Sequence, residues 1–129
     1  MADRIQLAPT AASAGKARRW TAEHAARAGV GEVSDTLGLL VSELVSNVVL
    51  HAHTPCDLSI SRLGTRLRVE LRDGSPRLPK RVGQPDPFAL SGRGMFLVDA
   101  LSDAHGAEPL DGGGKMVWFE LELPGSDEP

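Results

Sequence analysis

Cysteine is nearly absent from this sequence: among 129 residues there is one, Cys56. A single thiol cannot form a disulfide within the chain, which is typical of proteins from a reducing compartment. Residues 1–9 include Asp3 and Arg4 and lack the apolar stretch of a secretory signal. We therefore expect a cytoplasmic protein.

Long apolar runs and an excess of positive charge are also missing. The most apolar region, residues 37–50, is interrupted by Ser42, Glu43, Ser46 and Asn47, so no stretch reaches the roughly 18 apolar residues that span a membrane. The formal net charge is −3, which argues against direct binding of nucleic acid. What remains is the composition of one globular domain, with 41% hydrophobic and 24% charged residues.

Hydrophobic periodicity predicts an α+β domain. Apolar residues at helical spacing follow a capping position at Ser34 or Asp35, and Pro55 marks the end of that helix. We expect a strand at 4–7, helices at 10–28 and 34–52, strands at 57–62 and 66–72, a helix at 95–104, and strands at 106–110 and 115–123. Helices then cover one face of a mixed, mostly antiparallel sheet. Around the domain at 10–124 we expect an N-terminal segment at 1–9 and an acidic tail at 125–129.

Polar residues spaced by four interrupt the apolar pattern of the second helix. Glu43, Asn47 and His51 each lie four residues apart, so on an α-helix they form one slowly drifting stripe. An amide oxygen suits a hard cation, and a nearby carboxylate suits a general base. The spacing is equally typical of a helix face that points to solvent, and that alternative stays open.

Two further motifs are weak when taken alone. Asp73-Gly74 follows a strand directly, where a carboxylate can accept a hydrogen bond from an exocyclic amine such as that of adenine. Gly92-Arg93-Gly94 opens a helix, where backbone N–H groups favour a phosphate. A plain turn and a loop hinge explain the same residues. Residues 75–91 between them are irregular and Pro-rich, which indicates either a binding lid or a surface loop.

The order of these features is more specific than any one of them. A helix with Glu-x-x-x-Asn, a strand ending in Asp-Gly, a Pro-rich loop and a Gly-x-Gly helix start resemble the GHKL superfamily of ATP-binding domains. That superfamily includes gyrase, heat-shock chaperone ATPases, histidine kinases and mismatch-repair ATPases. In its short single-domain form, the chain resembles the bacterial anti-sigma factor serine kinases and related actinobacterial regulatory ATPases. The resemblance covers about residues 10–123 and implies a two-layer α/β sandwich that binds ATP with Mg²⁺.

The resemblance also implies a role for each motif residue. Glu43 resembles the general base, Asn47 the Mg²⁺ ligand and His51 a variable position near phosphate. Asp73 with Gly74 resembles the adenine-reading motif, and 75–91 resembles the ATP lid. The residues that resemble the second glycine box, which lies over the phosphates, are Gly92, Arg93, Gly94 and Met95.

The sequence departs from the family pattern in two places. The first glycine box usually reads Asp-x-Gly-x-Gly, whereas here Asp73 is followed by Gly74, Ser75, Pro76 and Arg77. The last strand often starts with a Thr that supports the adenine-reading Asp, whereas here Gly114 is followed by Lys115. Water or Ser75 is a candidate replacement for that missing hydroxyl.

The resemblance implies a regulatory serine/threonine protein kinase that phosphorylates an anti-sigma antagonist, with a homodimer as one possible assembly. The rival hypothesis is a nucleotide-gated module that binds a sigma factor or another regulator without turnover. The missing glycines favour the rival, and the intact Glu43 favours the kinase. A third hypothesis, the catalytic domain of a histidine kinase, is less favoured because no dimerising histidine helix pair precedes the domain.

The predicted strand at 66–72 carries three arginines, Arg66, Arg68 and Arg72. Their even spacing places them on the same face of the strand. Such a row is typical of a solvated sheet face. A docking surface for an acidic partner is the alternative.

Overall fold

The computed structural model of the protein describes residues 3–74 and 92–124. In chain order the elements are β1 (Asp3–Leu7), α1 (Ala12–Arg27), η1 (Gly31–Val33), α2 (Ser34–Asn47), η2 (Val48–Ala52), β2 (Cys56–Leu63), β3 (Arg66–Asp73), α3 (Gly92–Leu101), β4 (Ala104–Pro109) and β5 (Lys115–Glu122). The order and kind of the predicted strands and helices are confirmed. The expected lid at 75–91 and tail at 125–129 lie outside the described residues.

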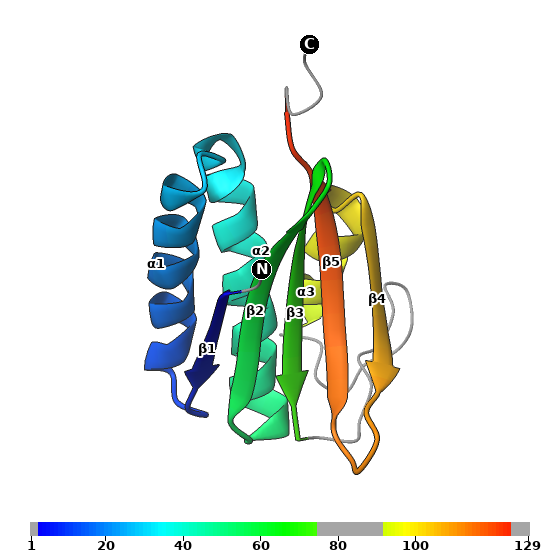
Figure 1. The fold of residues 1–129 in the computed structure, drawn as a ribbon. Helices are drawn as coiled ribbons and strands as arrows, with labels where there is room; N and C mark the ends of the chain where they lie inside the picture. The colour runs from blue at the N-terminus through cyan, green and yellow to red at the C-terminus, as the bar shows by residue number, and fades with distance from the viewer. Residues whose placement is uncertain (1–2, 75–91, 125–129) are drawn as a thin grey trace.

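The strands form one sheet in the order β1-β2-β3-β5-β4, and every neighbouring pair is antiparallel. Residues 3–7, expected in an N-terminal segment, form the edge strand β1 of this sheet. Figure 1 looks onto the open face of the sheet and shows the helices behind it, on the other face. The chain is therefore a two-layer α+β domain, as predicted.

The core lies between the sheet and the helices. Strict alternation along β3 buries Leu67, Val69 and Leu71, and β5 buries Phe119 beside them. The buried apolar residues of α2 are Leu37, Leu40, Val41, Leu44 and Val45. Burying each such side chain stabilises the fold by about 1.5–3 kcal/mol. This packing fixes the orientation of α2, and with it the direction of the helix's polar residues.

The start of α2 differs from the expectation. Ser34 or Asp35 was expected to cap the helix, but Ser34 is already its first residue and no side chain caps it. The 3₁₀ turn η1 leads into the helix instead, and its backbone bonds replace a side-chain cap. The end of α1 follows the prediction, because Gly29 takes a left-handed conformation with φ of 74° just past the helix.

Length and composition alone make the segment Gly31–Leu50 a candidate membrane span among the described residues, with a mean hydropathy of 1.4. The interrupted apolar pattern of residues 37–50 predicted no such segment. Its apolar residues are largely those that α2 buries against the sheet. Packing within the domain therefore accounts for its apolar character.

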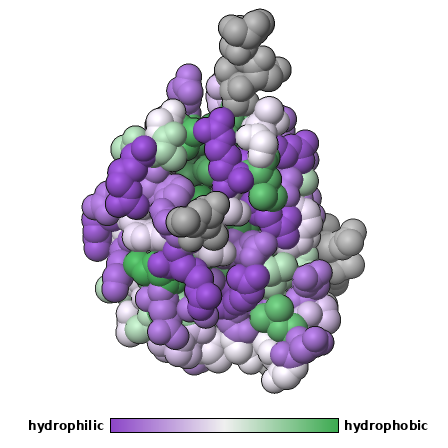
Figure 2. Space-filling model, viewed as in Figure 1, coloured by the Kyte–Doolittle hydropathy of each residue, from purple (hydrophilic) through white to green (hydrophobic). Residues whose placement is uncertain are grey.

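Paired charges cover the open face of the sheet. Arg68 donates to Glu70 and to Glu120, with distances of 2.8 and 2.9 Å, and its guanidinium lies 4.2 Å from the centre of the Trp118 ring. Arg66 also donates to Glu120. Figure 2 shows this face as mostly hydrophilic, with small separated apolar areas. Because the arginines already have carboxylate partners, these contacts favour the interpretation as a solvated face.

The charge network predicts a pH-dependent contribution to stability. Hydrogen bonding from Arg68 lowers the pKa of Glu120 below its ordinary value of 4.5, against the opposing effect of burial. A carboxyl whose pKa falls on folding stabilises the native state above its unfolded pKa and loses this effect as the pH falls through its folded pKa. Replacing Arg68 by Met should therefore lower the free energy of unfolding at pH 7, and the difference from wild type should shrink below about pH 4.5.

Urea unfolding between pH 3 and pH 7 measures this difference. Arg62→Met is the matched control, because Arg62 is exposed on the same sheet and donates to a backbone carbonyl rather than to a carboxylate. A pH-independent difference for Arg68→Met would contradict the assignment.

Candidate nucleotide-binding site

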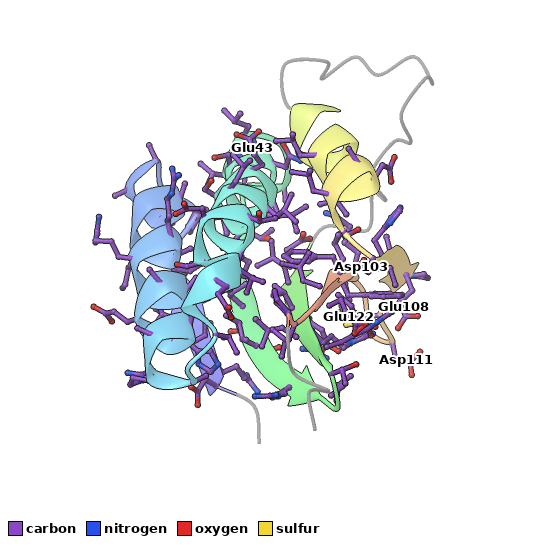
Figure 3. The ribbon with its side chains drawn as sticks, turned by 90° about the horizontal axis from the view of Figure 1, so that it is seen from above. Glu43, Asp103, Glu108, Asp111 and Glu122 are labelled. Carbon is purple, nitrogen blue, oxygen red and sulfur yellow. The ribbon has the colours of Figure 1, made fainter. Side chains whose placement is uncertain are left out.

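The last turn of α2 carries two of the predicted site residues on one face. Glu43 and Asn47 are four residues apart within the α-helix, and both are partly exposed. Figure 3 shows Glu43 on the side of α2 that is turned away from the sheet. Within the described ranges, no hydrogen bond or ion pair engages either side chain. A carboxylate and an amide are thus held together on a rigid helix with their polar atoms available to a ligand.

The helix does not continue beyond Asn47 as an α-helix, contrary to the prediction that it runs to residue 52. A π-helical turn, η2, follows, in which the N–H of His53 donates to the carbonyl of Val48 at 3.0 Å. A π-turn advances fewer degrees per residue than an α-helix, so the α-helical spacing applies to Glu43 and Asn47 within α2, whereas His51 belongs to η2. The side chain of His51 lies outside the description.

Asp73 lies in one row across the end of the sheet. Its register partners are Cys56 on β2 and Lys115 on β5. Figure 1 shows the ends of β3 and η2 and the start of β5 together at the lower end of the molecule. The sheet therefore presents Asp73 at the same end as the polar turn of α2.

A buried ion pair engages Asp73. The Nζ of Lys115 donates to Oδ2 of Asp73 at 2.8 Å, and the two side chains are 11% and 1% exposed. Water or Ser75 was the candidate from the sequence for the group that replaces the missing hydroxyl beside this carboxylate. In the described part of the chain, the ammonium of Lys115 donates to this carboxylate, and Ser75 lies outside the described residues. The sequence shows only that Lys115 opens the last strand, and the register of β3 with β5 places it opposite Asp73.

Gly74 is held by a residue that sequence reasoning missed. Its backbone N–H donates to Oγ1 of Thr54 at 3.0 Å, and a Cβ added at Gly74 would lie 3.4 Å from the methyl group of Thr54. Thr54 belongs to the connection between η2 and β2, so the hydrogen bond ties the end of the α2 segment to the end of β3. The N–H of Gly74 is therefore already used within the protein.

The turn that leads into β5 also touches the end of β3. Gly114 has a φ of 90°, and a Cβ added there would lie 2.3 Å from the carbonyl oxygen of Asp73. Only glycine allows this approach, which places Lys115 opposite Asp73.

Replacing Gly114 by alanine should therefore lower the free energy of unfolding more than the same change at Gly112. Gly112→Ala adds a Cβ in open space at a φ of 82°, so it should cost about 1–2 kcal/mol of backbone strain. Gly114→Ala adds the same strain and a clash with backbone atoms, so it should cost at least about 1–3 kcal/mol more. Chemical denaturation of both variants measures the contrast. Equal losses would show that the contact with Asp73 is unimportant.

Cys56 on β2 lies beside Asp73, on the side opposite to Lys115. Burial, and to a lesser extent the negative charges of Asp73 and Asp57, raise the pKa of this thiol to about 11. The thiol is therefore neutral near pH 7, and it packs as a small apolar residue, as expected from the sequence.

The helix α3 begins at Gly92, three residues earlier than the predicted 95–104 helix, and Gly92, Arg93 and Gly94, expected to open this helix, form its first turn. It packs beside α2 in the helical layer. The N-terminal turn of a helix of this length carries unpaired N–H groups and the positive end of the dipole. The side chains of Arg93 and Met95 lie outside the description.

Comparisons with known proteins agree with this geometry. The sequence matches the family model described as a histidine kinase-like ATPase domain over residues 7–121. A search of curated proteins finds no match. One similar solved structure is the histidine kinase domain from the blue-light activated histidine kinase of Erythrobacter litoralis EL346, with a TM-score of 0.50 and 24% identity. The likeness covers 89% of this chain and 61% of that one, and it concerns the fold. The family model matches most of the chain, so this protein belongs to the histidine kinase-like ATPase family.

Proposed function

We propose that this protein is a cytoplasmic regulatory kinase that binds ATP with Mg²⁺ and phosphorylates a serine or threonine of a partner protein. The observation that carries the proposal is the pair formed by Glu43 and Asn47, one turn apart on α2 and partly exposed. Membership in an ATPase family supplies the nucleotide. The end of β3 with Asp73 and the first turn of α3 complete the proposed site.

The residues on α2 suit a magnesium ion that is shared with a nucleotide. Among the described residues, no group of three or more His, Cys, Asp and Glu side chains could hold a metal by itself. Mg²⁺ commonly takes few protein ligands and completes its shell with water and phosphate oxygens. The amide oxygen of Asn47 would be such a ligand. When bound, the ion would neutralise part of the phosphate charge.

The proposed transfer gives each residue one task. The carboxylate of Glu43 accepts the proton of the substrate hydroxyl, whose oxygen forms a bond to the γ-phosphorus while the bond to the β,γ-bridging oxygen breaks and ADP leaves. Asp73 orients the base by accepting from the adenine amine. The N–H groups at the start of α3, at Gly92–Gly94, stabilise phosphate charge. The resemblance to anti-sigma factor kinases makes an anti-sigma antagonist the proposed substrate.

The buried ion pair between Asp73 and Lys115 favours a second candidate function. Its carboxylate is 1% exposed and bound to Lys115, so a base reaches it only after the groups over it move. Together with the missing glycines after Gly74, this favours a module whose nucleotide occupancy regulates binding of a sigma factor or another regulator. Such a module needs no turnover, and Glu43 would then be dispensable.

Calorimetric titration with ATP, with and without Mg²⁺, tests the site itself. We expect binding that depends on Mg²⁺ and that Asn47→Ala weakens by about tenfold or more, because one ligand of the ion is lost. Gln6→Ala is the matched control, since Gln6 is an exposed amide on β1. Absence of binding at millimolar ATP would contradict the proposal.

A further inference from the structure

We propose that Thr54 is a positioning residue for nucleotide binding: it fixes the peptide group between Asp73 and Gly74, and the flat face of this group at Gly74 supports the base. This inference rests on the proposed nucleotide-binding function and names the surface on which the base lies. It starts from the hydrogen bond that the N–H of Gly74 donates to Oγ1 of Thr54 at 3.0 Å.

Thr54 supplies an acceptor at the point where the pairing of β2 with β3 ends. The last pair in this register is Cys56 with Asp73. The next pair would be Pro55 with Gly74, and proline has no N–H to donate. The side chain of Thr54 accepts from the N–H of Gly74 instead, so the chain is held for one residue beyond the end of β3.

The π-turn η2 places Thr54. The N–H of His53 donates to the carbonyl of Val48 at 3.0 Å and closes the turn, and His53 takes a left-handed conformation with a φ of 57°. This conformation is uncommon for a residue other than glycine, and it ends the helical segment directly before Thr54. Since η2 follows Asn47, one continuous segment carries the proposed magnesium ligand and the residue that holds Gly74.

The peptide group between Asp73 and Gly74 is held at both of its edges. In a planar trans peptide, the N–H and the C=O point in opposite directions. The N–H edge faces Thr54, whereas the carbonyl edge faces Gly114, where an added Cβ would clash with the oxygen of Asp73. The flat face of the group is what remains for a ligand, and Gly74 is exposed.

A glycine at the end of β3 suits a flat ligand. Because Gly74 has no side chain, a purine ring can approach the backbone closely and pack on the peptide group. A surface that is already fixed loses less conformational entropy on binding than a mobile one. Contact with this surface does not require access to the carboxylate of Asp73, which is 1% exposed. Thr54 therefore acts through Gly74, without touching the nucleotide.

Titration calorimetry of the full chain with MgATP and with magnesium tripolyphosphate tests the proposal. Thr54→Val keeps a methyl group and removes the acceptor, so it should weaken MgATP binding by about three- to tenfold. The affinity for magnesium tripolyphosphate, which has no base, should stay within about twofold of wild type. Thr54→Ser keeps the hydroxyl and should retain the wild-type affinity for MgATP.

Thr65→Val is the matched control, because the hydroxyl of Thr65 also makes a hydrogen bond, to Glu122 at the opposite end of β3. It should leave both affinities unchanged, and circular dichroism confirms that each variant is folded. Amide hydrogen exchange of the wild-type chain needs no variant. Exchange at Gly74 should slow when MgATP binds, and it should slow less with magnesium tripolyphosphate.

Three results would overturn the inference and leave the proposed function standing. They are an unchanged MgATP affinity in Thr54→Val, an equal loss of affinity for MgATP and tripolyphosphate in that variant, and tripolyphosphate that binds wild type as tightly as ATP does. Exchange at Gly74 that is the same with both ligands also overturns it, even if Thr54→Val does not fold. If wild type binds neither ligand, the proposed function fails together with the inference.

Discussion

Replacing Glu43 by Gln should lower the rate of phosphoryl transfer to a partner serine by about 100- to 10,000-fold, the usual contribution of a general base. The carboxylate lies on a well-packed helix, where Leu44 and Val45 beside it are buried. The change keeps the shape of the side chain and removes its ability to take a proton. Nucleotide affinity should change little, since the base acts on the substrate hydroxyl. Transfer of labelled phosphate to the partner and calorimetric ATP binding measure the two effects separately.

The control for Glu43→Gln is Glu23→Gln, which makes the same chemical change at an exposed position of α1. It should leave both rate and affinity unchanged. If Glu43→Gln regulates the partner as wild type does, the kinase hypothesis fails as an account of function. The nucleotide-gated module would then be the better explanation.

Replacing Lys115 by Met should lower the free energy of unfolding by about 3–5 kcal/mol, the usual cost of removing one partner from a buried ion pair. Methionine keeps most of the aliphatic stem and removes the ammonium. The carboxylate of Asp73, 1% exposed, then loses the hydrogen bond from Nζ. Guanidinium unfolding with an unchanged m-value measures the loss as a change in stability.

A second substitution separates the ion pair from general packing. Adding Asp73→Asn to Lys115→Met removes the buried negative charge that Lys115 balanced, so the double variant should recover more than half of the lost stability. Lys16→Met, an exposed change on α1, should shift stability by less than about 0.5 kcal/mol. A double variant no more stable than Lys115→Met would show that the loss comes from packing rather than from the buried charge.

The helices and strands were predictable because their signals are local. Alternation of apolar residues in 66–72 identified β3, and Gly29 marked the end of α1. The boundaries moved where tertiary contacts or backbone geometry decided them. α3 starts at Gly92 although two glycines in its first turn favour a loop, and α2 starts without the expected cap at Ser34. The π-turn after Asn47 left no mark in the hydrophobic periodicity.

The sequence by itself determined the family, the order of elements and the pair formed by Glu43 and Asn47, because a four-residue spacing on one helix suffices to place two side chains together. Only the tertiary structure decided what surrounds Asp73. Lys115 is 42 residues away from Asp73 along the chain, and Thr54 is 20 residues away from Gly74. Their contacts depend on the register of β3 with β5 and on the path of the chain after η2. No local pattern specifies that pairing; the common core behind the sheet brings these residues to one end of it.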